Sequence, residues 1–346
     1  MTGPRGADVT RHVVVDTDAG IDDACALLYL AGHPGVEITA VTSVAGNRPE
    51  RDVARNIGCV TRLLGLAPPV ARGAARPLPG APSVPRGTHG TDGLGAPLAR
   101  HGLPRPMPAV TGESATELIV RLARERPGDL DLLALGPFTN LALALRIDPA
   151  LFTKYRSVVL MGGSGPYDVP GERLVRDSNI ARDPAAARAV ATAPRADLVM
   201  LGVDVTATVL LPTEAIAALD AAGTPVARFA AAILGAYPRL DDAPGRRGGV
   251  PLHDPLAAGI LLDPSLATGT TIGPVAVLPD GPLWRARLMR TAEGLPPPFP
   301  CEPAPDTRVV TAADAGRFVR DFLHTLTQGF PLPHATDPAP PRPGGR

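Results

Sequence analysis

The chain has 346 residues, with 34 Lys and Arg against 34 Asp and Glu, so its formal net charge is zero. This balance gives no long-range attraction to polyanions and argues against nucleic acid or an anionic membrane surface as the partner. The first residues lack the apolar stretch of a secretory signal, and no run approaches the roughly 18 apolar residues of a membrane helix. Three cysteines without a CxxC pair favour the reducing cytoplasm.

Short apolar strands alternate with helices along the chain. Strands are predicted within residues 12–15, 36–47, 129–136, 157–161 and 197–203, and helices within 24–33, 51–66, 139–147, 184–192, 213–221 and 312–328. Such alternation predicts an α/β fold with an open, mostly parallel, Rossmann-like sheet covered by helices on both faces. We expect a single domain over residues 1–335 and a disordered, Pro- and Gly-rich tail over 336–346.

Polar loops that follow strands are the expected location of the chemistry, because ligands of such sheets bind beyond the carboxyl ends of the strands. Four loops meet this description: residues 16–23, 46–47, 136–140 and 162–179. A fifth segment, residues 72–108, is rich in Pro and Gly and too long for an ordinary connection, so it is a candidate active-site flap.

The first of these loops is strongly acidic. Asp16, Asp18, Asp22 and Asp23 lie within eight residues. So much negative charge at the end of a buried strand repels itself unless a cation is present. A donor set without thiolate or imidazole favours Ca²⁺ or Mg²⁺ over Zn²⁺. Helix capping is the simpler alternative, but it accounts for only one or two of the four carboxylates.

The DxD pattern of Asp16 and Asp18 also fits a haloacid-dehalogenase-like phosphatase, with the first Asp as nucleophile. That chemistry needs a lysine beside the phosphate. Lys154 is the only lysine, and it precedes a predicted strand instead of following one. The phosphatase is therefore a remote alternative.

A second candidate group is the pair His253 and Asp254, which opens a helical run. An imidazole that can act as acid or base stands here beside one more carboxylate suited to a metal ion. A pair of this kind is more often structural when it stands alone. Together with the acidic loop it indicates an active site.

The chain carries, in order, VVVDTDAGIDDACALL, AVTSVAGN, THGTDGLG, LALGPFTNLA, VVLMGG, SNIARDPAAA and PLHDPLA. This series resembles the motifs of the nucleoside hydrolases of the inosine-uridine-preferring type, from about Val13 to Pro264 and more loosely to the last helix. The resemblance implies a Ca²⁺-dependent enzyme of nucleoside catabolism. It would hydrolyse the N-glycosidic bond of a ribonucleoside to free base and ribose, as a homodimer or homotetramer.

The resemblance also implies roles for individual residues. Ca²⁺ would be held by Asp18, Asp23, Asp254 and the main-chain carbonyl of Leu135, with Asp18 also taking a proton from the attacking water. His253 is the candidate acid for the departing base. The implied substrate-binding residues are Asp22, Asn47 and Asn179 at the ribose diol, Asp177 at the 5′ side, His89 and Tyr237 at the base, and Asp254.

One segment departs from the family pattern. PGERLVRDSN stands where the family has a Gly-Asn pair and a Glu-Phe-Asn triplet, so Asp177 replaces Glu and an amide donor to the 5′ side is missing. Arg173 or Arg176 would suit an anionic 5′ substituent, although surface solvation explains either arginine as well. Two alternatives therefore stay open: a hydrolase of a different, 5′-substituted N-riboside, and a non-catalytic protein that binds Ca²⁺ and a ribosyl ligand. The base preference is open too.

Overall fold

A mostly parallel sheet of eight strands forms the centre of the fold in the computed structural model, which describes residues 10–81, 87–95, 106–164, 177–238, 248–280, 285–290 and 304–330. The strand order is β3-β2-β1-β4-β5-β6-β12-β9, and the pair β12 and β9 alone is antiparallel among the described strands of this sheet. The strands are β1 Arg11–Thr17, β2 Val36–Ser43, β3 Val70–Ala71, β4 Leu130–Ala134, β5 Ser157–Met161, β6 Leu198–Leu201, β9 Ala267–Gly273 and β12 Thr307–Ala313.

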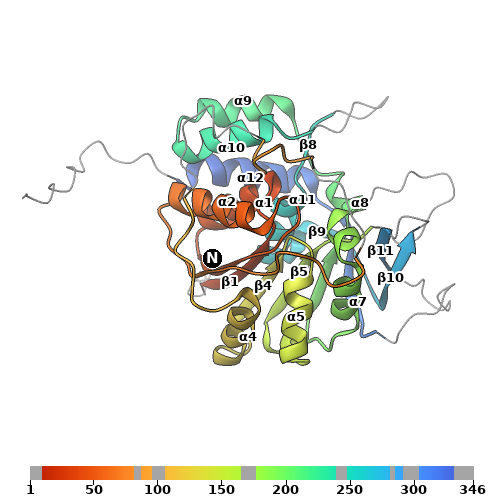
Figure 1. The fold of residues 1–346 in the computed structure, drawn as a ribbon. Helices are drawn as coiled ribbons and strands as arrows, with labels where there is room; N and C mark the ends of the chain where they lie inside the picture. The colour runs from red at the N-terminus through yellow and green to blue at the C-terminus, as the bar shows by residue number, and fades with distance from the viewer. Residues whose placement is uncertain are drawn as a thin grey trace, which may run out of the picture.

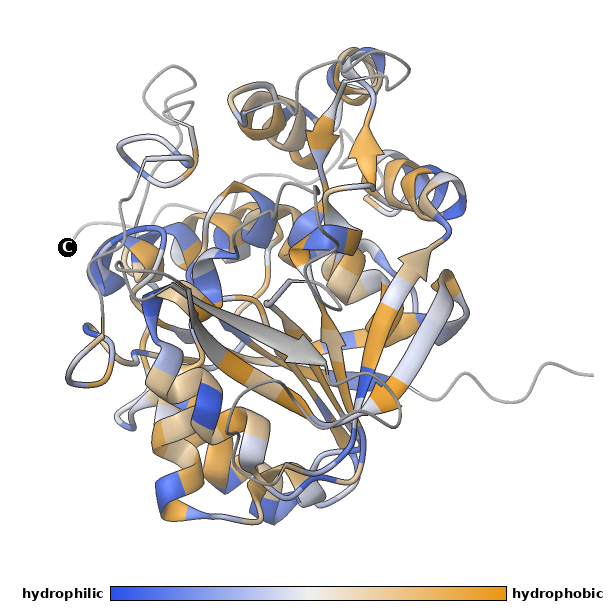
Figure 2. Cartoon of the chain, turned by 90° about the vertical axis from the view of Figure 1, so that its right-hand side faces the viewer, coloured by the Kyte–Doolittle hydropathy of each residue, from blue (hydrophilic) through white to orange (hydrophobic). Residues whose placement is uncertain are grey.

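Helices cover both faces of the sheet (Figure 1). One face packs against α1 Ile21–Gly32, α2 Glu50–Leu63, α11 His253–Leu262 and α12 Ala315–Gln328, and the other against α4 Ala115–Glu125, α5 Thr139–Ile147 and α7 Pro184–Thr192. The helices α9 Thr213–Ala221 and α10 Pro225–Gly235 form a further layer that packs on α1 and α12 (Figure 1). Strand β1 explains why there are two cores. Val13 and Val15 enter the first hydrophobic cluster and Val14 the second, because successive side chains of a strand point to opposite faces. Figure 2 shows the resulting hydrophobic strands.

Smaller elements complete the structure: the helices α6 Ser178–Arg182 and α8 Val203–Thr206, the 3₁₀ turns η1 Leu151–Lys154 and η2 Pro264–Leu266, and the two-stranded ribbons of β7 Leu210–Leu211 with β8 Val250–Pro251 and of β10 Val275–Asp280 with β11 Arg285–Arg290. None of the helices in the described part of the chain is long and apolar enough to span a membrane.

The predicted α/β class, the mostly parallel sheet and the helices on both faces are confirmed. The last helix was expected from residue 312, but Ala312 and Ala313 finish β12 and the helix begins at Ala315. The structure adds α4, α10 and the strands β9 to β12, which the sequence pattern did not predict. The tail 336–346, Arg173, Arg176 and part of the segment 72–108 lie outside the described residues.

The sheet brings the predicted loops together at one edge. Asp16 pairs in register with Thr42 of β2 and Ala134 of β4. The acidic loop, residues 44–47 and Leu135 therefore leave neighbouring strands side by side at their carboxyl ends, as the topology rule requires.

Candidate active site

The acidic loop makes a tight turn from β1 into α1. Ala19 has a φ of 38°, a left-handed conformation that is uncommon for a residue with a side chain. Thr17 supports it: the Thr17 hydroxyl accepts the N–H of Ala19 at 3.0 Å and donates to Oδ1 of Asp23 at 2.5 Å. Asp23 in turn accepts the N–H of Gly20 at 2.8 Å. The carboxylate of Asp23 is thus fixed at the beginning of the helix.

Asp18 is held from the neighbouring strand by Asn47. The backbone N–H of Asn47 donates to Oδ2 of Asp18 at 2.6 Å, and its side-chain amide donates to Oδ1 at 3.1 Å. The same amide lies 3.4 Å from Oδ2 of Asp23. One asparagine therefore orients two of the carboxylates that the sequence assigned to a metal ion.

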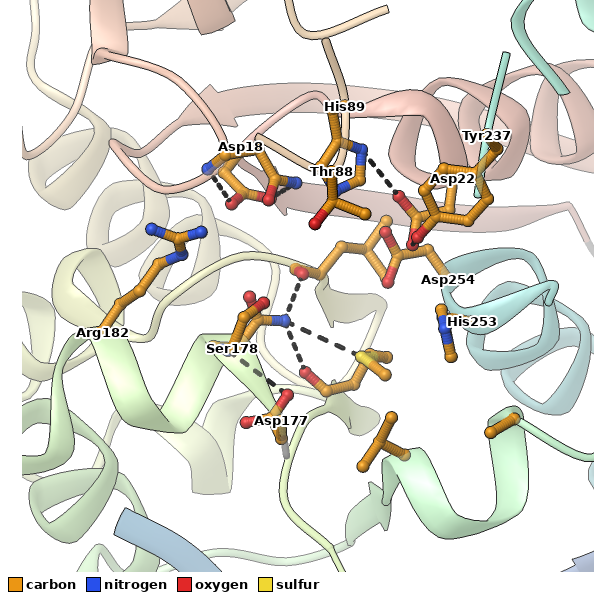
Figure 3. A pocket seen from close by; sticks show the side chains of 16 residues that line it. Asp18, Asp22, Thr88, His89, Asp177, Ser178, Arg182, Tyr237, His253 and Asp254 are labelled. Atoms are coloured by element: carbon orange, nitrogen blue, oxygen red, sulfur yellow. Dashed lines mark hydrogen bonds and ion pairs between the residues drawn. The ribbon is translucent and has the colours of Figure 1, made fainter. Parts of the chain in front are cut away.

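A pocket of about 240 Å³ opens above this loop (Figure 3). Ten of the eleven predicted site residues line it: Asp18, Asp22, Asn47, His89, Leu135, Asp177, Asn179, Tyr237, His253 and Asp254. The eleventh, Asp23, is completely buried and does not line the pocket. The structure thus brings together residues that lie up to 236 positions apart (254 minus 18) in the sequence.

Three carboxylates converge closely enough to share one cation. Single oxygens of Asp22, Asp23 and Asp254 lie within 4.8 Å of one another, and all three residues are buried. Burial raises the pKa of each carboxyl above its usual range, and the neighbouring negative charges raise the pKa of Asp23 and Asp254 further. Oδ1 of Asp22 is buried and has no hydrogen bond within the described residues. This donor set fits a hard divalent cation, which would offset the repulsion.

Asp18 stands beside this group without belonging to it. Burial raises the pKa of Asp18 well above its usual range, and the charge of Asp23 adds to the effect. The predicted set of ligands contained Asp18, whereas the three oxygens that lie within 4.8 Å of one another come from Asp22, Asp23 and Asp254.

The Leu135 carbonyl faces the pocket and accepts a hydrogen bond from the side-chain amide of Asn179 at 2.6 Å. The same amide donates to the carbonyl of Met161 at 3.0 Å. A carbonyl oxygen has two lone pairs, so Leu135 can accept from Asn179 and still bind a cation. Asn179 therefore joins the ends of β4 and β5 at the pocket.

His89 and Tyr237 form the aromatic side of the pocket. Their ring centroids are 5.3 Å apart, and the Tyr237 hydroxyl donates to Oδ2 of Asp22 at 3.1 Å. The backbone N–H of Ile21 donates to Nδ1 of His89 at 3.1 Å. Burial lowers the pKa of His89 to about 4, so the ring is neutral and carries its proton on Nε2.

His253 begins α11 and contacts a hydroxyl outside the predicted set. Its Nδ1 lies 2.6 Å from Oγ1 of Thr206. Burial lowers the pKa of His253, while the negative charge of Asp22 opposes that effect. Because Nδ1 is engaged, Nε2 is the nitrogen that remains for a ligand in the pocket.

Asp177 lies at the opposite end of the pocket from Asp254 and His253 (Figure 3). Its carboxylate caps α6 by accepting the N–H of Asn179 at 3.3 Å and of Ile180 at 2.6 Å. Burial raises the pKa of Asp177 to about 6, and the backbone hydrogen bonds limit the shift.

Several pocket residues were not singled out from the sequence, among them Thr88, Ser178 and Arg182. Arg182 is four residues after Ser178 on α6, a spacing that puts both on one helix face, and its charge partly offsets the effect of burial on the pKa of Asp18. An Asp at position 177 is a typical N-cap residue, and this was the signal in the sequence that could have predicted the short helix α6.

Lys154, which the phosphatase alternative requires, is not among the pocket residues. Its ammonium group lies 2.9 Å from Oδ1 of Asp148, on the turn after α5. The phosphatase alternative is therefore wrong, because the lysine that it requires does not line the pocket.

Comparisons with known proteins agree with this geometry. The profile of the family described as inosine-uridine preferring nucleoside hydrolase matches residues 13–320. The pyrimidine-specific ribonucleoside hydrolase RihA of Salmonella typhimurium is 34% identical over 74% of this chain and 81% of its own length. Among solved structures, a plant nucleoside hydrolase has a TM-score of 0.80 at 26% identity, covering 92% of this chain and 99% of the other. A purine-preferring ribonucleoside hydrolase from Gardnerella vaginalis has a TM-score of 0.77 at 27% identity, and it also covers 92% of this chain and 99% of its own.

The match with the family profile spans nearly the whole described sheet, from β1 into α12. It agrees with the ordered series of motifs in the sequence and with their convergence on one pocket. The chain belongs to the inosine-uridine-preferring nucleoside hydrolase family and is an enzyme of the ribonucleoside N-ribohydrolase class.

Proposed function

We propose that this enzyme is a Ca²⁺-dependent hydrolase that converts a ribonucleoside to free base and ribose. The observation that carries the proposal is the pocket itself, in which a group of buried carboxylates faces the imidazole of His253. A non-catalytic ribosyl-binding protein would need the carboxylates for a cation, but it would not need an acid for the leaving group.

Asp18, Asp23, Asp254 and the Leu135 carbonyl are the proposed Ca²⁺ ligands, with Asp22 close enough to contribute. Oxygen atoms are the ligands that Ca²⁺ prefers, and water and the ribose hydroxyls would supply the rest of its six to eight ligands. When bound, the ion would supply Lewis acidity that lowers the pKa of a water molecule and would orient the ribose diol. Asn47 supports the arrangement by fixing Asp18 and approaching Asp23.

The chain's own residues perform the remaining steps. Asp18 accepts a proton from the attacking water, and its contacts with Asn47 hold its carboxylate in one orientation. Asp22, Asn47 and Asn179 hold the ribose hydroxyls, so that C1′ lies beside the nucleophile. Positive charge develops on the sugar as the N-glycosidic bond breaks, and the buried carboxylates stabilise it.

The base leaves on the side of His253, which donates a proton to it through Nε2. His89 and Tyr237 contact the base. We propose that pyrimidine ribonucleosides are the preferred substrates, because the curated relative with 34% identity is named as pyrimidine-specific and His89 occupies the pocket.

A second candidate substrate is a riboside with an anionic 5′ substituent. Arg182 favours it, since this cation lines the pocket from α6, the helix that Asp177 caps. It lies among the described residues, unlike Arg173 and Arg176, on which the sequence first based this idea.

The test is the release of reducing sugar from purine and pyrimidine ribonucleosides and from their 5′-phosphates, with Ca²⁺ and after chelation. Calcium-dependent release from uridine and cytidine is the expected result. Faster release from a 5′-phosphate would establish the second candidate. No release from any compound by a protein that still binds Ca²⁺ would overturn the proposal. The remaining alternative would then be a non-catalytic protein that binds Ca²⁺ and a ribosyl ligand.

We also propose that residues 1–335 form one domain and that the enzyme acts in the cytoplasm as a homodimer or homotetramer. Light scattering on the purified chain measures the assembly, and limited proteolysis tests the single domain. A monomer, or two stable fragments, would contradict these proposals.

A further inference from the structure

Thr206 is a completely buried threonine at the end of α8 that the sequence pattern did not single out. Its hydroxyl oxygen lies 2.6 Å from Nδ1 of His253, the first residue of α11. These two residues are 47 positions apart in the sequence. Thr206 is not among the residues that line the pocket, so its contact with any substrate is indirect.

The backbone holds Thr206 and His253 in fixed relation. The N–H of Thr206 donates to the carbonyl of Gly202 at 3.1 Å, and the carbonyl of Thr206 accepts from Val209 at 3.2 Å. The carbonyl of Val209 then accepts the N–H of Leu252 at 3.0 Å, and Leu252 directly precedes His253. One short chain of hydrogen bonds thus connects the backbone of Thr206 to the residue that precedes His253.

A hydroxyl is a suitable partner for an imidazole that changes its protonation state. It accepts a hydrogen bond from Nδ1–H, which the ring carries as imidazolium and still carries after it has released the proton of Nε2. The contact therefore persists when His253 releases a proton from Nε2. A methyl group in the same place would leave Nδ1 buried without a partner, at a cost of about 1 to 3 kcal/mol.

We propose that Thr206 is a positioning residue for His253: it holds the ring so that Nε2 faces the leaving base both before and after proton donation. The inference rests on the proposed role of His253 as the acid. It predicts that Thr206 matters only when the leaving group requires a proton, because within the described part of the chain its hydroxyl contacts the side chain of His253 alone.

The experiment compares two ribosides with the variants Thr206→Val, Thr206→Ser and Thr208→Val. Uridine needs a proton on its leaving base, whereas p-nitrophenyl riboside releases a stable phenolate without one. Thr206→Val replaces the hydroxyl by a methyl group of similar size, and Thr206→Ser restores the hydroxyl. Thr208→Val is the matched control, since Thr208 lies two residues away and its hydroxyl donates only to the carbonyl of Val205 at 2.7 Å among the described residues.

We expect Thr206→Val to lower kcat on uridine by about tenfold to a hundredfold, part of the 10² to 10⁴ that general acid catalysis provides. Its kcat on p-nitrophenyl riboside should change by less than about threefold, and the KM of uridine should change as little. Thr206→Ser should recover most of the rate on uridine, and Thr208→Val should match the wild type on both ribosides.

An equal loss on both ribosides, or no loss on uridine, would overturn the positioning role. ¹⁵N NMR of the His253 ring gives a readout that does not depend on turnover. The neutral wild-type ring should carry its proton on Nδ1, where the Thr206 hydroxyl accepts it, and Thr206→Val should shift protons toward Nε2. An unchanged tautomer would also overturn the inference. Failure of the wild type on both ribosides would instead overturn the proposed function.

Discussion

Gly46 leaves room for Asp18 in the wall of the pocket. An ideal Cβ on residue 46 would lie 2.7 Å from Cγ of Asp18 and 2.8 Å from its Cβ, and closer still to Oδ2. On the other side, an ideal Cβ on Gly136 would lie 2.9 Å from the backbone N of Asp18. Asp18 is thus packed between two stretches of backbone that come near it only because they carry no side chains.

Gly46→Ala should therefore displace the carboxylate of Asp18. We expect kcat/KM to fall at least about tenfold and the free energy of unfolding to fall by about 1 to 3 kcal/mol, because overpacking a dense site costs this much. Steady-state kinetics and urea unfolding measure the two quantities. Gly112→Ala is the control: apart from its chain neighbours, no atom of the described residues lies within 4 Å of the added Cβ, so both quantities should stay unchanged. Native activity in Gly46→Ala would contradict the proposed role of Asp18.

Asp18→Asn keeps the shape of the side chain but removes its ability to accept a proton from water. We expect kcat to fall by about 10³-fold or more, since general base catalysis contributes about 10² to 10⁴ and altered metal geometry adds to the loss. Without metal, the free energy of unfolding of the variant should be at least that of the metal-free wild type, because burial disfavours the charged form of Asp18. Asp220→Asn, on the exposed side of α9, is the control. A variant with near-native turnover would show that Asp18 is not the base.

Asp177 should make the stability of the metal-free protein depend on pH. Burial raises its pKa from 3.8 to about 6 in the folded state. A raised carboxyl pKa contributes stability that is present below about pH 4 and is lost as the pH rises through about 6. The loss amounts to at most about 3 kcal/mol, from 1.36 kcal/mol per pKa unit.

Asp177→Asn cannot ionise and keeps a side-chain oxygen that can cap α6. The difference in Tm between this variant and the wild type, measured after chelation, should therefore favour the variant increasingly from pH 4.5 to pH 7.5. The comparison isolates Asp177 from the other buried carboxyls, which shift in the same direction in both proteins. A pH-independent difference would contradict the raised pKa.

The sequence predicted the fold where local pattern and tertiary packing agree. Strand β5 and helices α7 and α9 have the predicted bounds, because their apolar spacing matches the faces they bury. Strands β9 and β12 were missed for a physical reason. β9 is an edge strand with alternating exposed residues such as Thr270 and Ile272, and its pairing partner lies 40 residues further along. No local pattern specifies such a pairing.

Those pocket residues that lie in recognisable sequence motifs could be predicted from the sequence. The predicted residues do meet, but the sequence did not predict that Asp22, and not Asp18, would form a group with Asp23 and Asp254 whose oxygens lie within 4.8 Å of one another. That distinction depends on the turn at Ala19 and on the contact between Asn47 and Asp18. Thr206 could not be predicted at all, since its role follows from a contact across 47 residues.

Calcium should stabilise the protein, and the stabilisation should increase with pH. The carboxyls of Asp18, Asp22, Asp23 and Asp254 have raised pKa values because they are buried together, so protons compete with the cation for them. At a Ca²⁺ concentration about 100 times its Kd, binding contributes about 2.7 kcal/mol to the free energy of unfolding. The increase in Tm should therefore be small at pH 5 and reach its full value at pH 7 to 8.

Asp254→Asn tests whether this effect comes from the proposed site. The variant lacks one charge of the acidic group, so it should lose most of the Ca²⁺-induced increase in Tm while its metal-free form folds normally. Asp220→Asn should retain the full increase. Mg²⁺ should stabilise the wild type less than Ca²⁺ does, because it requires near-ideal octahedral geometry at shorter distances than a fixed group of carboxylates and a carbonyl provides. An equal increase in Tm for Asp254→Asn and the wild type would place the calcium elsewhere and remove the metal from the mechanism proposed for this pocket.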